Sequence, residues 1–168
     1  MKISGKEVSV LKLITVIGTV VGAILSSIQL YEFACNKFSL SEAEVKQKAT
    51  AALLEYQTAI NTQNFDAYKL FDSRVERFIT MKNVTPAEIN EYINNSYYAE
   101  FINPTITFDM NSITVNRFDK NGVEIEVIQN DDFYRYSKKR KERHKTHLKI
   151  ILNKDYKIKL FDLYRIIK

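Results

Sequence analysis

The longest apolar stretch of the chain runs from Leu13 to Tyr31 and contains no charged residue. As a helix rising about 1.5 Å per residue, it would be roughly 28 Å long, close to the ~30 Å hydrocarbon core of a bilayer. It is apolar on all sides, whereas a helix on a protein surface has one apolar stripe. The pattern predicts a membrane-spanning helix over 13–31, with a tail over 1–12 and a linker over 32–40.

Two other interpretations of this stretch would change the mature protein. A cleaved signal peptide has a shorter apolar core and a small-x-small cleavage site, and Leu13 to Leu25 followed by two serines fits that pattern in part. Lipidation at Cys35 would need small residues before the cysteine, but Glu32 and Phe33 stand there. We therefore interpret residues 13–31 as a permanent anchor.

The residues on either side of the anchor predict its orientation. Lys2, Lys6 and Lys12 precede it, whereas acidic and basic residues mix after it. By the positive-inside rule the N-terminus stays in the cytoplasm and the following domain lies outside it.

Gly18 and Gly22 form a G-x-x-x-G pair, which predicts a face on which two anchor helices can approach closely.

Residues 41–104 show the period of helices. Ser41 and Glu44 form a capping box, and apolar residues at helical spacing continue to about Thr62. Asn64 is expected to cap a second helix. The apolar stripe of that helix would consist of Phe65, Tyr68, Phe71, Val75 and Phe78.

The third predicted helix has the clearest N-terminal capping signals. Thr85 is the expected cap, Pro86 takes the first helical position and Glu88 completes a capping box. Pro104 is expected to end the helical part. The buried side of the third helix would consist of Ile89, Tyr92, Ile93 and Tyr97.

After Pro104 the pattern changes to alternation, and β-branched residues become frequent. Asn121-Gly122 predicts a hairpin turn, because both residues tolerate positive φ. The strands are expected from Ile106 to Val115, from Val123 to Tyr136, from His147 to Leu152 and from Tyr156 to Ile167, with a charged tip over 137–142. The pattern predicts an α+β domain over 41–168, with three helices packed on a curved four-stranded antiparallel sheet.

Composition and charge narrow the function classes. The chain has 20 aromatic residues, and Gly122 is the one glycine beyond the anchor, so we expect an ordered domain. A net charge of +5 is too small to indicate a nucleic-acid binder. The single cysteine, Cys35, excludes an intrachain disulfide and a cysteine-rich metal site.

A dense run of basic residues surrounds the charged tip. It could contact the phosphates of lipid head groups, a nucleic acid or an acidic protein surface. The alternative is a solvated hairpin whose charges prevent edge-to-edge aggregation. The run consists of Arg135, Lys138, Lys139, Arg140, Lys141, Arg143, Lys145 and Lys149.

No local motif assigns catalytic, cofactor or metal residues. His144 and His147 are three apart in a predicted strand, so they should point to opposite faces and not share a metal ion. No Ser-His-Asp or Cys-His arrangement can be assembled from neighbouring residues.

A long amphipathic helix, two shorter helices and long antiparallel strands resemble the nuclear transport factor two-like (SnoaL-like) superfamily, in which a curved sheet wraps helices into a cone. The segment from Tyr56 to Tyr68 is most similar to the opening of that fold. The resemblance implies a site inside the cone, where isomerases and dehydratases of the superfamily place an acid or histidine with a tyrosine. Candidates for such a site are Asp66, Asp72, Tyr56, Tyr92, Asp109, Asp131 and Asp132.

The layout of tail, single anchor and exported domain is similar to the inner-membrane assembly factors of type IV secretion channels. That resemblance implies a non-enzymatic scaffold with protein partners or self-association. The alternative is a tethered cone domain that binds a small ligand or acts on it. No cofactor is expected for either.

Overall fold

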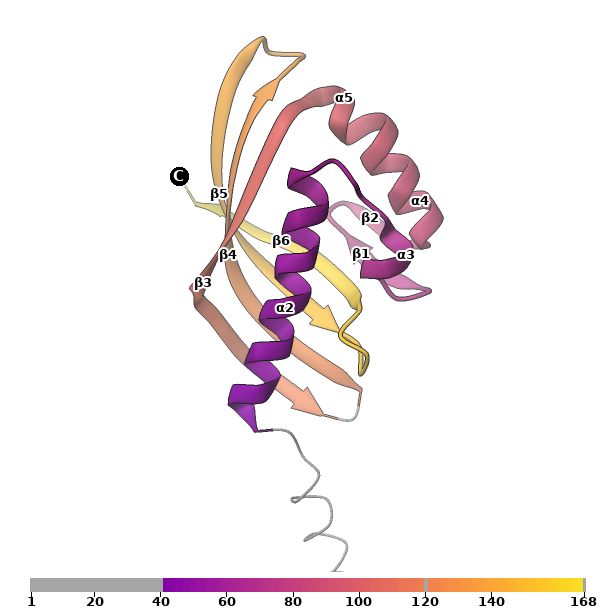
Figure 1. The fold of residues 1–168 in the computed structure, drawn as a ribbon, viewed down its shortest axis with the longest axis vertical. Coiled ribbons are helices and arrows are strands. Elements are labelled where there is room, and N and C mark those ends of the chain that lie inside the picture. Colours follow the sequence, from indigo (N-terminus) through magenta and orange to yellow (C-terminus); the bar gives the residue numbers. More distant parts are fainter. Residues whose placement is uncertain (1–40, 120, 168) are drawn as a thin grey trace, which may run out of the picture. The chain divides into compact units, whose positions relative to one another are not determined.

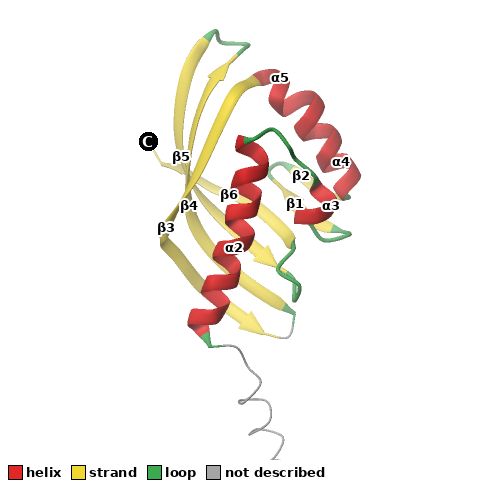
Figure 2. Ribbon diagram, viewed as in Figure 1, coloured by secondary structure: helices red, strands yellow, loops and turns green. Residues whose placement is uncertain are grey.

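The computed structural model describes residues 41–119 and 121–167, and the predicted tail, anchor with its glycine pair, and linker lie outside them. The described residues form an α+β unit in which three helical segments lie against one side of a curved, six-stranded sheet (Figures 1 and 2). None of the helices in this part of the chain is long and apolar enough to cross a bilayer.

The first and third predicted helices are confirmed. Helix α2 spans Glu42–Asn61 and begins with the predicted capping box of Ser41 and Glu44. The third segment is a continuous rod of α4 (Pro86–Glu91), the π-helix η1 (Tyr92–Tyr97) and α5 (Tyr98–Glu100). Thr85 and Glu88 form its capping box, and Ile89 and Ile93 are its most buried residues.

The sheet has six strands instead of the four that were predicted. Its order is β2-β1-β6-β5-β4-β3, with β1 parallel to β6 and every other pair antiparallel. The predicted four-stranded meander is present as β3 to β6. The strands are β1 (Val75–Phe78), β2 (Met81–Val84), β3 (Phe101–Asp119), β4 (Gly122–Arg135), β5 (Arg140–Leu152) and β6 (Ile158–Ile167).

The prediction of a second helix up to Phe78 is wrong. Helix α3 covers only Ala67–Leu70, and its cap is Asp66, not Asn64. Beyond it the chain forms the β1–β2 hairpin, which pairs with β6. Tyr68 of the predicted helical stripe is 59% exposed, and its other four residues are buried. Pairing with a distant strand overrides the local spacing.

Two proline and glycine predictions have different outcomes. Pro104 does not end the helical part: α5 ends at Glu100, and Pro104 lies inside β3, at a bulge in this edge strand, where proline is tolerated. The Asn121-Gly122 turn is confirmed, since Asp119 pairs with Gly122. Gly122 has φ +138, and a Cβ there would lie 1.9 Å from the carbonyl oxygen of Leu152, so only glycine fits.

The core lies between the helices and the inner face of the sheet, which we define as the face carrying Val123, Ile125 and Val127. These three side chains are at most 5% exposed, while the intervening Glu124 and Glu126 lie on the outer face. A cluster of aromatic rings fills the interior between α2, α3, β1 and β6. It consists of Tyr56, Phe65, Phe71, Phe78, Phe108 and Phe161.

Side chains of α2 cover the open edge of β3. The Asn61 amide acts like a neighbouring strand: its Nδ2 donates to the carbonyl of Ile106 at 2.9 Å, and its Oδ1 accepts from the N–H of Ile106 at 2.7 Å. Gln57 Oε1 accepts from the N–H of Phe108 at 3.0 Å. These bonds satisfy backbone groups that would otherwise be free to pair with another chain.

We expect Asn61→Ala to destabilise the domain by about 1–3 kcal/mol, because it leaves two partly buried backbone groups of β3 without partners. Urea unfolding followed by circular dichroism measures this loss. Gln63→Ala, two residues on and exposed, is the matched control and should change stability by less than about 0.5 kcal/mol. Equal effects of the two substitutions would contradict the role given to Asn61.

Candidate functional site

Polar residues replace apolar ones on the inner face toward the far end of β4 and β5. Along β4, Gln129 and Asp131 follow Val127 on the same face, and the register places them opposite Thr146 and His144 of β5. Gln129 and Thr146 are buried, whereas Asp131 and His144 are partly exposed. An acid and a histidine are thus directly opposite each other, where Cβ atoms lie about 4.5–5.5 Å apart.

Asp131 is held in an environment that favours its neutral form. Burial raises the pKa of its carboxyl group, although a hydrogen bond from Gln129 and the nearby His144 oppose this shift. Gln129 Nε2 donates to Asp131 Oδ1 at 2.5 Å. The other amide atom, Gln129 Oε1, is buried and has no hydrogen-bond partner among the described residues.

Two tyrosines, Tyr56 of α2 and Tyr97 of the helical rod, are influenced by the charge of this acid. Burial is the main cause that raises the pKa of Tyr56 and Tyr97, and the negative charge of Asp131 raises both further. Burial raises the pKa of Tyr98 to about 12. The π-helix η1 carries Tyr92 and Tyr97, and such turns are frequent at functional sites.

The inner face is open beside Asp131 and His144. Leu163 and Ile166 of β6 pair with Leu148 and Thr146, so they belong to the same face. Yet Leu163 is 40% and Ile166 is 62% exposed, while their partners are nearly inaccessible. We call the part of the inner face bordered by Asp131, His144, Leu163 and Ile166 the mouth.

A chain of aromatic rings leads from the helical rod to His144. Tyr97 packs on Phe101 with ring centroids 4.9 Å apart, and Phe101 packs on Phe133 at 4.6 Å. Phe133 meets the imidazole of His144 edge-on at 5.2 Å. The mouth therefore combines one acid and one histidine with aromatic and aliphatic surface.

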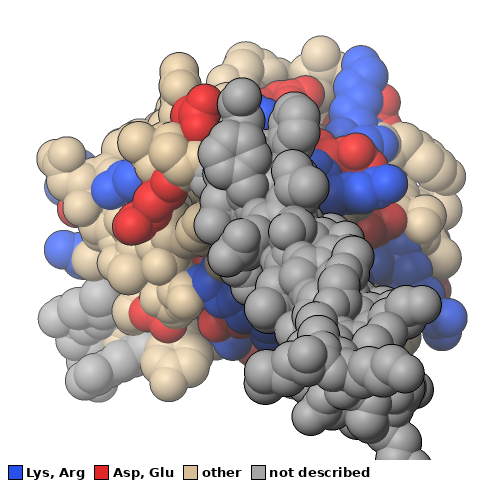
Figure 3. All heavy atoms as spheres, turned by 90° about the horizontal axis from the view of Figure 1, so that it is seen from below, with Lys and Arg blue, Asp and Glu red and all other residues tan. Residues whose placement is uncertain are grey.

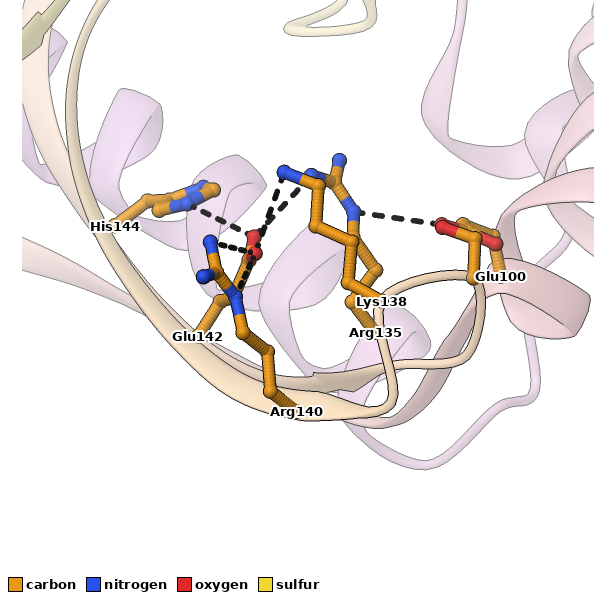
Figure 4. Close-up of polar contacts among 7 residues, drawn as sticks. Glu100, Arg135, Lys138, Arg140, Glu142 and His144 are labelled. Atoms are coloured by element: carbon orange, nitrogen blue, oxygen red, sulfur yellow. Dashed lines mark hydrogen bonds and ion pairs between the residues drawn. The ribbon is translucent and has the colours of Figure 1, made fainter.

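The carboxylate of Glu142 is the centre of a charge cluster beside His144 (Figure 4). Arg140 binds it at 2.8 Å, Arg135 at 3.2 Å and Lys138 at 3.5 Å, and His144 Nε2 lies 3.4 Å from it. Arg135 also pairs with Glu100 at the end of the helical rod, at 3.4 Å. The cluster ties the tip of the β4–β5 hairpin to α5.

The pKa of Glu142 is lowered. Its side chain is only 6% exposed, and burial alone would favour the neutral acid. The hydrogen bond from Arg140 and the charges of Lys138 and Arg135 outweigh burial. Glu142 and Asp131 thus lie on one face with opposite pKa shifts.

The other acids proposed from the sequence lie apart from the mouth and have structural partners. Asp66 caps α3, and Asp72 binds Asn153 and the backbone of Ser73. Asp109 accepts from the backbone of Asn111 at a bulge of β3, and Asp132 pairs with Arg143 on the outer face. Burial raises the pKa of Tyr56, and of that predicted set Asp131 and Tyr92 both raise it further.

The eight predicted basic residues do not form one free patch. Arg135, Lys138 and Arg140 pair with Glu142, while Arg143 and Lys149 pair with Asp132 and Glu124. Three lysines form no ion pair among residues 41–119 and 121–167. They are Lys139, Lys141 and Lys145.

The two histidines lie on opposite faces, as predicted. His144 is on the inner face, whereas His147 Nε2 lies 3.1 Å from Glu126 on the outer face. Within the part of the chain that the structure describes, no three His, Cys, Asp or Glu residues are grouped to hold a metal ion.

A cleft of about 640 Å³ lies at the other end of the domain, among the β3–β4 turn, the β5–β6 turn and the segment after α3. Two of the three cations in its lining are paired with acids of the same lining, Arg117 with Asp119 and Lys159 with Glu76. Seen from this end, Lys and Arg alternate with Asp and Glu on the visible surface (Figure 3). We therefore place the candidate site at the mouth.

Sequence reasoning named Asp131 but missed Gln129 and assigned no role to His144. The alternation of Val123, Ile125 and Val127 already indicated that Gln129 and Asp131 continue on the inner face. What the sequence did not supply was the β4–β5 register, which places His144 opposite Asp131.

No protein-family model and no curated protein sequence matches this chain. Several solved structures, however, are similar to it. A nuclear transport factor 2 (NTF2-like) superfamily protein from Salmonella enterica has a TM-score of 0.62 at 16% identity, over 76% of this chain and 95% of its own. An NTF2-like protein of unknown function from Exiguobacterium has a TM-score of 0.53 at 10% identity, over 67% of this chain and 95% of its own.

A proposed aromatic ring hydroxylase from Novosphingobium aromaticivorans has a TM-score of 0.57 at 11% identity, over 76% of this chain and 95% of its own. At these identities the likeness shows the fold and not a shared activity. Since these proteins are covered almost entirely, it shows that residues 41–168 correspond to a whole domain. The described part of the chain has the NTF2-like α+β fold.

Proposed function

We propose that this domain binds a small, largely apolar molecule at its mouth and contacts it through Asp131 and His144. The observation that carries the proposal is the position of Asp131, a carboxyl group with a raised pKa on an inner face that stays open beside Leu163 and Ile166. Ligand sites combine apolar lining with a few converging polar groups, and groups with shifted pKa values concentrate in them.

The chemistry of the mouth favours a flat, neutral ligand with a hydrogen-bonding group. The partly exposed rings of Phe101 and His144 offer aromatic surface, and the buried ring of Phe133 packs between them. Asp131, when neutral, can donate a proton in a hydrogen bond, and His144 can donate or accept. An acid opposite a histidine can also move a proton on a bound molecule, so the site is suited to proton transfer.

The binding proposal is tested by NMR on ¹⁵N-labelled domain 41–168 with a library of small neutral aromatic fragments. We expect the fragments that bind to shift the amide signals of Asp131, His144 and Ile166. Asp131→Ala should weaken the binding about 10- to 100-fold, the range for losing a hydrogen bond in a desolvated site. Its matched control is Asp132→Ala, because Asp132 is next in sequence but pairs with Arg143 on the outer face. Equal effects of the two variants, or shifts only on the outer face, would contradict the proposal.

We propose further that the domain is tethered to a membrane by residues 13–31 and lies outside the cytoplasm. The uncharged apolar stretch and the lysines before it support this arrangement. Reporter fusions at the C-terminus test it: an exported reporter should be active and a cytoplasmic one inactive. The reverse result would contradict either the membrane tether or its proposed orientation.

A role in assembly is the second candidate, and the exposed end of β6 favours it. Leu163, Tyr164 and Ile166 are 40–68% exposed and would be covered by a protein partner or a second copy. Light scattering on domain 41–168 distinguishes the two. A stable dimer in which fragments no longer reach the mouth would favour assembly, and a monomer that binds fragments would favour the ligand site.

A further inference from the structure

The β4–β5 hairpin ends in a surface that the proposed binding site does not use. We call residues 134–143 together with Lys145 the basic tip. They include seven Lys and Arg residues and one acid, Glu142. Figure 1 shows the basic tip at the end of the domain opposite to the start of α2.

The basic tip is held in place by two carboxylates. Glu142 binds Arg135, Lys138 and Arg140 from within the hairpin. Glu100 of α5 pairs with Arg135, accepts a hydrogen bond from the side chain of Ser137, and its carbonyl accepts from the N–H of Tyr136 at 2.8 Å. Because these contacts fix the turn, the charges that remain free are presented without a further loss of backbone entropy.

The free charges lie beside exposed apolar side chains. Lys139, Lys141 and Lys145 are exposed and form no ion pair among the described residues. Ile102, Tyr134 and Lys141 stand opposite one another as a row on the outer face. Tyr136 at the turn is 65% exposed, and Tyr134 and Ile102 are 36% and 38% exposed.

The outer face next to this row is hollowed. A depression of about 500 Å³ lies over β3, β4 and β5, and its lining includes the cations Arg143 and Lys145, the acids Asp131 and Asp132, and His144. Arg143 pairs with Asp132, which leaves Lys145 as the cation of this lining without an ion pair among the described residues.

We propose that the basic tip docks on a bilayer surface that contains anionic lipid. Lysines attract anionic head groups, and tyrosines prefer the boundary between head groups and acyl chains. An acidic protein would account for the lysines but gives no reason for the row of Ile102 and Tyr134 beside them.

The test uses domain 41–168, which has its own core and corresponds to whole proteins of the same fold. It is sedimented with vesicles of phosphatidylcholine alone or with 30% phosphatidylglycerol, at low and high salt. We expect binding to the anionic vesicles only, weakened by salt. Replacing Lys139, Lys141 and Lys145 by Gln should lower the partition coefficient about 100-fold, because each lysine near an anionic surface contributes about fivefold.

The matched control replaces Lys46, Lys82 and Lys154 by Gln, which removes the same net charge elsewhere on the domain. It should keep most of the vesicle binding, and circular dichroism should show both variants folded. Equal losses in the two triple variants would overturn docking through the tip. Absence of binding to anionic vesicles would also overturn it. If the domain instead bound polyglutamate in a salt-sensitive way, the basic tip would be assigned to an acidic protein partner. The fragment experiment on Asp131 is independent of all these outcomes.

Discussion

Asp131→Asn should raise the stability of the domain at neutral pH. Burial raises the pKa of Asp131 above its ordinary value of 3.8, so the folded state prefers the protonated acid. An acid with a raised pKa contributes stability below its unfolded pKa, and that contribution is lost as the pH rises through the folded pKa. Asparagine cannot ionise. The variant therefore avoids the free-energy cost of an ionised, partly buried carboxyl group, which the wild-type domain bears at pH 7.

Thermal unfolding of both proteins between pH 3.5 and 8 measures this difference. The melting temperatures should nearly coincide at the acid end and separate as the pH rises. At pH 7 the variant should be more stable by about 0.5–2 kcal/mol, the common gain from a single stabilising substitution. Asp119→Asn is the control with the opposite sign. Hydrogen bonds from Asn121 and Arg117 lower the pKa of Asp119, so its replacement should reduce stability at pH 7. A destabilising Asp131→Asn would contradict the environment that we assign to Asp131.

Phe78→Ala should produce the largest loss of stability, about 3–5 kcal/mol. Phe78 is completely buried on β1, and its ring packs against Phe71 at 5.2 Å and Phe161 at 5.8 Å. It also meets Tyr92 of η1 at 6.1 Å. Its removal opens a cavity where the helical rod, β1 and β6 meet.

Urea unfolding of domain 41–168 measures the loss, and failure of the variant to fold would agree with it. Phe118→Ala is the matched control, because Phe118 is 43% exposed at the end of β3. Its replacement should cost less than about 1 kcal/mol. Similar midpoints for the two variants would show that the β1–β2 hairpin is not part of the core.

Local signals in the sequence predicted those elements whose ends are fixed by neighbouring residues. The capping boxes of Ser41 and Thr85 start α2 and α4, and Asn121-Gly122 makes the β3–β4 turn. Each of these signals acts over three or four residues, so the rest of the fold does not alter it.

Elements that depend on distant partners were not predicted. Val75 and Phe78 read as one side of a helix, but β1 is set by its pairing with β6, more than 80 residues further along the chain. The site has the same dependence, since His144 faces Asp131 only through the register across the hairpin tip. In the sequence Glu142 is one acid among basic residues, and only the folded hairpin makes it the centre of the cluster.

The central claim is that Asp131 lies at the mouth of the inner face as a carboxyl group prepared for a ligand. The most direct test is a pH titration of its side-chain carbonyl by ¹³C NMR, with and without the fragment that binds best. We predict a pKa above the ordinary value of 3.8 and above that of Asp119, and a change of this pKa when the fragment is added. A pKa of Asp131 at or below that of Asp119, unchanged by the fragment, would contradict the account.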